Sequence, residues 1–222
     1  MSLRRRVLEA GLGSETVGRE LRARLERLDG ALNDLSGGTG APKDFDPSVF
    51  VAPGIPRVRP LLVLLSERAA RAHLEGEQGT APLDDMDAAE HVAVAAELLH
   101  VAIVVHDGAL GLPGGRRRRA ARKLLGAVGW LGANHLTLRA LELARHAPTP
   151  GIVDDALDAL REIADGHALS ESIRGRTASS AESEELAEGY AGAVFDFSCR
   201  AGARVAGGDD GVIRALGRYG RH

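Results

Sequence analysis

Four consecutive arginines at 116–119, followed by Arg122 and Lys123, form a cationic cluster in a chain of balanced charge. Guanidinium groups can donate paired hydrogen bonds to phosphate oxygens, so the cluster is suited to a diphosphate, to RNA or to a membrane lipid. The alternative is a solvated loop that leads into a helix, although cations at a helix N-terminus are electrostatically disfavoured. The residue types alone leave both interpretations open.

A second set of candidates lies on one predicted helix, where His100 and Asp107 are seven positions apart. Seven residues make two helical turns, so both side chains lie on the same face. His106 and Asp107, at the end of this helix, could form a metal or catalytic pair. A histidine on an apolar helix is, however, more often a hydrogen-bonded core residue, and the other histidines lack the spacing of a metal site.

Asp154, Asp155 and Asp158 have the D-D-x-x-D spacing of some metal sites. They directly follow a Pro-Gly dipeptide, however, and therefore fall in the first turn of a predicted helix, where capping and the helix dipole favour acidic residues. We interpret them as helix-start residues, and we interpret the aspartates of segment 84–87 in the same way. The chain contains no P-loop, Rossmann fingerprint or G-x-S-x-G motif.

Composition and charge narrow the function classes. The 222 residues include 28 Lys+Arg and 31 Asp+Glu, which argues against a uniformly basic nucleic-acid binder. A single cysteine, Cys199, excludes a disulfide framework and is interpreted as a small buried hydrophobe. The first residues do not form a signal peptide, and the most apolar runs are far shorter than the roughly 20 residues of a membrane span. We expect a cytoplasmic protein with no transmembrane segment and no nucleic-acid partner.

The elements that position these residues are predicted to be helices. Aromatic residues make up only 3% of the chain, which disfavours β-sandwiches and barrels. Apolar residues recur at spacings of three and four, and Gly and Pro separate the periodic segments. The predicted helices cover about 14–35, 59–74, 87–107, 116–145, 152–176, 182–206 and 209–220.

Segment 87–107 is the most informative of these helices. Between Val92 and His106 its only fully charged residue is Glu97. A helix that is apolar on every side lies at the centre of a larger bundle. We therefore predict a single all-α domain over residues 1–222, with Ile103 buried.

Several short segments occur in an informative order. Gly54–Leu62 is similar to G-G-K-R-x-R-P-L-L, and Glu97–His100 with Val105–Asp107 is similar to E-L-I-H…x-H-D-D-x-x-D. Further similarities are to R-R-G at Arg116-Arg117, to L-A-G-D-Y-L at Leu131–Leu136, to the E-G-Q segment at Asp165–His167, and to two later helices at Phe195–Gly207 and Leu216–Gly220. Over most of its length the chain thus resembles the trans-polyprenyl diphosphate synthase family.

The resemblance implies a fold and a site. The fold is an isoprenoid-synthase-type helical bundle around a central cavity, here truncated at the C-terminus. The implied residues for substrate diphosphate are Arg57, His100, Arg116 and Arg117, and Asp107 is the remnant of the metal site. Family members form dimers by packing central helices, so we expect a homodimer, or a heterodimer with an active prenyl synthase subunit.

The departures from the family pattern bear on activity. Gly108 and Gly111 replace the second and third aspartates of the first motif, and the second aspartate motif would fall beyond the last residue of the chain. Tyr190-Ala191 replaces a Lys-Thr pair that aids the leaving diphosphate, and Pro56 replaces a lysine.

Three functions are compatible with these observations. The first is a catalytically impaired homologue that binds isoprenoid diphosphate or acts as an accessory or regulatory subunit; it requires no cofactor, and magnesium matters only if residual activity exists. The second is an active prenyltransferase that condenses isopentenyl diphosphate with an allylic diphosphate, its missing parts coming from a partner or from further residues of its own. The third is a purely structural interaction protein.

Overall fold

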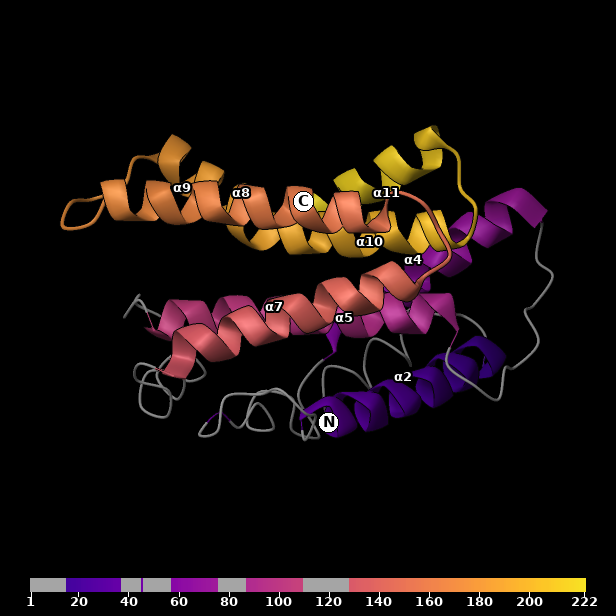
Figure 1. The fold of residues 1–222 in the computed structure, drawn as a ribbon. Helices are drawn as coiled ribbons and strands as arrows, with labels where there is room; N and C mark the ends of the chain where they lie inside the picture. Colours follow the sequence, from indigo (N-terminus) through magenta and orange to yellow (C-terminus); the bar gives the residue numbers. More distant parts are fainter. Residues whose placement is uncertain (1–14, 37–44, 46–56, 76–86, 110–127) are drawn as a thin grey trace.

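The computed structural model describes residues 15–36, 45, 57–75, 87–109 and 128–222, and all regular structure among them is helical (Figure 1). The first four helices are α2 (Glu15–Ser36), α4 (Val58–Glu75), α5 (Ala88–Ala109) and α7 (Val128–His146). They are followed by α8 (Ile152–Ser172), α9 (Ser180–Leu186), a π-helix η1 (Ala187–Gly192), α10 (Ala193–Val205) and α11 (Asp210–Arg221). The all-α prediction is confirmed for this part of the chain.

Helix α5 occupies the centre of the bundle. It packs against α7, α4, α10 and α2, and Figure 1 shows α2 on one side of it and the layer of α8, α10 and α11 on the other. Its apolar residues therefore meet a neighbour in every direction. Ile103, for example, is 6% exposed, which confirms the predicted central position.

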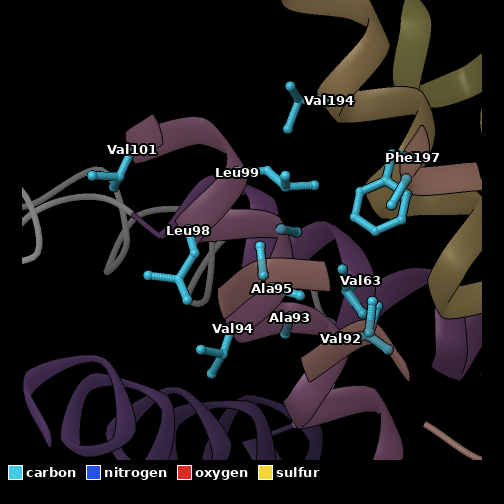
Figure 2. Packing of buried hydrophobic residues seen from close by; sticks show 14 of the residues in the cluster. Val63, Val92, Ala93, Val94, Ala95, Leu98, Leu99, Val101, Val194 and Phe197 are labelled. Carbon is cyan, nitrogen blue, oxygen red and sulfur yellow. The ribbon is translucent and has the colours of Figure 1, made fainter. Parts of the chain in front are cut away.

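The core is built from small and branched side chains. Figure 2 shows Leu98 and Leu99 of α5 among neighbouring alanines and valines, with Phe197 of α10 and Val63 of α4 facing the same region. Each fully buried Leu or Phe stabilises the fold by about 1.5–3 kcal/mol relative to an exposed one. Cys199 is buried and forms no disulfide, as the sequence predicts.

Over Ala88–Gly108, helix α5 is long and apolar enough to cross a membrane by length and composition alone, but 83% of its apolar 18-residue window is buried inside the protein. The start of α5 is held by a reciprocal capping box, in which the backbone N–H of Asp87 donates to Glu90 and that of Glu90 donates to Asp87. Arg24 of α2 contacts both carboxylates and also Glu67 of α4, so one buried cation joins three helices.

Two predicted helices differ from the structure. The helix expected over 152–176 ends at Ser172, before a turn in which Gly175 has a φ of 86°. The helix expected over 182–206 is divided by η1, whose two glycines at 189 and 192 have poor α-helix propensity. The predicted helix at 116–145 is confirmed from Val128 onward, and its first part lies outside the described residues.

Candidate functional site

One flank of α5 carries the charged and titratable residues of the candidate site. Glu97, His100 and Asp107 are spaced by three and seven positions, which places them along a single face. At 1.5 Å per residue, Glu97 and Asp107 are about 15 Å apart along the helix axis. We call the region of Arg57, Asp29, Glu97 and His100 the arginine end, and the region of Asp107, His167 and Tyr190 the aspartate end.

At the arginine end, a guanidinium lies between two carboxylates from different helices. Nε of Arg57 donates to Oδ1 of Asp29 on α2 at 2.8 Å, and Nη1 lies 3.2 Å from Oε1 of Glu97 on α5. The side chains of Arg57 and Glu97 are 1% and 0% exposed. A buried carboxylate is costly unless a counter-charge is close, so Arg57 explains how the apolar helix α5 tolerates Glu97.

The other residues predicted to bind diphosphate are placed only in part. His100 is half-buried and lies one turn after Glu97, so the structure brings it to the arginine end. Arg116 and Arg117 lie outside the described residues. Arg59, two residues after Arg57, stacks over the ring of Phe195, with its guanidinium carbon 4.8 Å from the ring centre.

At the aspartate end, a buried carboxylate accepts hydrogen bonds from two other elements. Asp107 is 0% exposed, and its Oδ1 accepts from the Tyr190 hydroxyl of η1. Nε2 of His167, on α8, lies 2.9 Å from the same oxygen and 3.3 Å from the Tyr190 hydroxyl. The two rings meet edge to face, with centroids 5.1 Å apart.

Sequence reasoning did not identify His167 or Tyr190 as site residues. Both occupy positions within the segments used for the resemblance, His167 at the glutamine of E-G-Q and Tyr190 at the lysine of Lys-Thr. Their alignment with these two motifs of the family pattern is the sequence signal that could have predicted their place in the site with Asp107. The π-helix that carries Tyr190 could not be foreseen from the periodicity, although single π turns are frequent at functional sites.

His106 lies next to this cluster and is the second histidine of the region. Its ring packs edge to face on Trp130, with centroids 5.2 Å apart. Burial, and to a smaller extent an electrostatic interaction with His167, lowers the pKa of His106, whereas Asp107 acts in the opposite direction. The neutral imidazole is therefore the favoured form here.

Two of the three aspartates near the start of α8, Asp155 and Asp158, form ion pairs. Oδ1 of Asp155 lies 2.6 Å from Nη2 of Arg200 on α10, and Arg204 contacts the same carboxylate. Asp158 pairs with Arg161 on the surface. As the helix-start interpretation predicts, Asp154 and Asp155 lie in the first turn of α8, where the helix dipole favours acidic residues. The capping part of that interpretation is wrong for Asp155, because the helix has Gly151 at its N-cap and no side-chain cap. Asp155 instead bridges two helices.

The arrangement of helices and motifs matches known proteins. The family model for polyprenyl synthetase matches residues 48–222. The chain belongs to the polyprenyl synthetase family. The comparison with curated proteins gives no match.

Solved structures of family enzymes share this fold. Geranyltranstransferase from Thermotoga maritima has a TM-score of 0.70 at 20% identity, over 90% of this chain and 72% of that one. A polyprenyl synthase from Caulobacter crescentus, complexed with calcium and isoprenyl diphosphate, has a TM-score of 0.75 at 25% identity, over 91% of this chain and 59% of that one. A decaprenyl diphosphate synthase from Rhodobacter capsulatus has a TM-score of 0.72 at 17% identity. The match covers 93% of this chain and 61% of that one.

The family pattern implies magnesium at Asp107, and the described residues do not fit it. Magnesium requires several oxygen ligands in near-octahedral geometry. Here Oδ1 of Asp107 already accepts from Tyr190 and contacts His167, and the adjacent Gly108 offers no side chain. Within the described ranges, no group of three or more His, Cys, Asp or Glu side chains could hold a metal ion.

Proposed function

We propose that this member of the polyprenyl synthetase family binds an isoprenoid diphosphate without magnesium, and that the chain alone does not catalyse prenyl elongation. The observation that carries the proposal is the engagement of Asp107 by Tyr190 and His167. In this arrangement the Asp107 carboxylate serves as a hydrogen-bond acceptor for neighbouring helices and not as a magnesium ligand. The protein then acts as an accessory or regulatory subunit in isoprenoid biosynthesis.

Prenyl elongation by this chain alone is disfavoured on electrostatic grounds. Ionisation of an allylic diphosphate leaves a diphosphate anion beside a carbocation, and stabilising that charge separation requires several kcal/mol from metal ions or other cations. Positions 108 and 111 are glycines, so Asp107 has no partner carboxylate in its own motif. Tyr190 also brings no positive charge where the family pattern has a lysine.

Diphosphate binding is favoured by the cations that the chain retains. Arg57, His100, Arg116 and Arg117 keep the residue types that the family pattern uses for diphosphate. Each charge-assisted hydrogen bond to a phosphate oxygen contributes about 1.5–3 kcal/mol. The Caulobacter crescentus relative was solved with isoprenyl diphosphate bound, which makes this the ligand class to test first.

A partner subunit is also part of the proposal. Leu131 and Leu138 on α7 are both 61% exposed in the described part of the protein, and they lie two turns apart on one face. Trp130 and Leu157 add apolar surface at 44% and 46% exposure. Exposed large apolar side chains of this kind are frequent at protein interfaces. We propose a homodimer in isolation, a heterodimer with an active prenyl synthase in the cell, and a cytoplasmic location.

Light scattering on the purified protein tests the oligomer. We expect a dimer at micromolar concentration for the wild type and a shift toward monomer for Leu131→Glu/Leu138→Glu. Leu74→Glu is the matched control, because Leu74 is an exposed leucine on another helix, α4. A wild-type monomer, or a control that dissociates as strongly, would contradict this part of the proposal.

Calorimetric titration with isopentenyl diphosphate tests the binding. We expect weak binding that is the same with magnesium and with a chelator, and a loss of about tenfold or more in Arg117→Ala. Arg119→Ala, in the same arginine run, is the control. Absence of binding would contradict the proposal, and binding that requires magnesium would favour an active prenyltransferase.

A further inference from the structure

The carboxylate of Asp29 engages Nε of Arg57, one of the donors that an anionic ligand of this arginine would use. Asp29 belongs to α2, and its Oδ1 accepts from Nε of Arg57 at 2.8 Å. Glu97 lies beside another nitrogen of the same guanidinium, and the Arg57 side chain is only 1% exposed. A phosphate group binds arginine best through two parallel hydrogen bonds along one open edge of the fork.

We propose that Asp29 is an internal competitor that covers Arg57 and must turn away before a diphosphate can bind there. The inference rests on the proposed function, since it concerns the regulation of the same diphosphate site. In this state α2 holds the arginine end closed, and ligand binding exchanges one anion at Arg57, the carboxylate, for another, the phosphate.

Asp29 is the displaceable partner of the two carboxylates. The Glu97 side chain is 0% exposed in the middle of α5, whereas that of Asp29 is 22% exposed on an outer helix. Four leucines of α2 anchor that helix in the core with 0–1% exposure: Leu21, Leu25, Leu28 and Leu32. The movement is therefore a change of the Asp29 side chain, with the helix staying in place.

Removal of the Asp29 charge should tighten diphosphate binding. The Asp29→Asn variant loses a competitor for Arg57 and also a negative charge that repels the ligand. We expect the affinity for isopentenyl diphosphate to rise about tenfold or more, the size of one charge-assisted hydrogen bond. Asp34→Asn is the matched control, because Asp34 is an exposed aspartate on another face of α2, and it should leave the affinity unchanged.

Calorimetric titration of the three proteins without magnesium tests the inference. Tighter binding in Asp29→Asn alone, or binding in that variant where the wild type shows none, supports it. Equal affinity in wild type and Asp29→Asn overturns the competitor role and leaves the proposed function standing. Absence of binding in both overturns both proposals.

A measurement on the wild type covers the case in which Asp29→Asn does not fold. The ¹H–¹⁵N signal of Arg57 Nε can be assigned by its absence in Arg57→Lys. This signal should shift when isopentenyl diphosphate displaces Asp29, and a signal that stays unchanged at saturating ligand overturns the inference.

Discussion

The arginine end and the aspartate end of the site hold their buried charged residues in opposite ways. At the arginine end a cation is held by carboxylates from α2 and α5, and one of these carboxylates is partly exposed. At the aspartate end an anion accepts from a tyrosine and contacts a histidine, and it has no exposed surface. The first arrangement retains a positive charge that can exchange partners, whereas the second commits its carboxylate to the fold. This difference supports the proposal that the protein binds a diphosphate without magnesium.

The largest effect is expected from removing the cation of the arginine end. Arg57→Gln removes the buried cation that Glu97 and Asp29 both contact, and we expect the free energy of unfolding to fall by about 3–5 kcal/mol. Urea denaturation followed by circular dichroism measures this loss. In Arg57→Gln/Glu97→Gln much of the stability should return, because the uncompensated charge is gone. A loss below about 1 kcal/mol in the single variant would show that the pair is not a structural element of the core.

A smaller effect is expected at the aspartate end. Tyr190→Phe removes the hydroxyl donor from buried Asp107, and we expect a loss of about 1–3 kcal/mol in the free energy of unfolding. The other tyrosine of the chain, Tyr219, is 71% exposed and provides the control Tyr219→Phe. Equal behaviour of the two variants would mean that the Tyr190 hydroxyl contributes nothing to holding Asp107.

The smallest effect is a dependence of stability on pH at the same end. Burial depresses the pKa of His106 below the ordinary histidine value of 6.5, so the unfolded chain takes up this proton more readily than the folded protein. The contribution of His106 is therefore present above pH 6.5 and is lost as the pH falls through the folded-state pKa. Unfolding free energies measured from pH 7.5 downward should decline less steeply in His106→Asn than in the wild type. An identical decline in both proteins would contradict this assignment, and His222→Asn, at an exposed histidine, is the control.

Much of the fold follows from local patterns in the sequence. The apolar stretch around Glu97 predicted a central helix, and the observed α5 begins and ends within two residues of the predicted bounds. The contacts of the site could not be predicted in the same way. Arg57 pairs with residues 28 and 40 positions away, and Tyr190 lies 83 positions from Asp107. Such pairs depend on how whole helices pack, and periodicity within one helix carries no information about them.

The π-helix illustrates the same limit on a smaller scale. The segment around Tyr190 has a helical pattern, and the sequence therefore predicted one continuous helix over 182–206. Tyr190 lies within η1, and its hydroxyl donates to Asp107. At Asp155, too, packing between helices decides the contacts. Its position at a helix start predicted capping, whereas the structure pairs it with two arginines of α10.

The central claim is that the chain alone cannot elongate a prenyl diphosphate. The most direct measurement incubates the purified protein with radiolabelled isopentenyl diphosphate, an allylic primer and magnesium, and resolves the products by chain length. The engagement of Asp107 by Tyr190 and His167 predicts no elongated product, at any magnesium concentration, from a protein that binds isopentenyl diphosphate in parallel titrations. A labelled product longer than the primer, formed by this protein without a partner, would contradict the account.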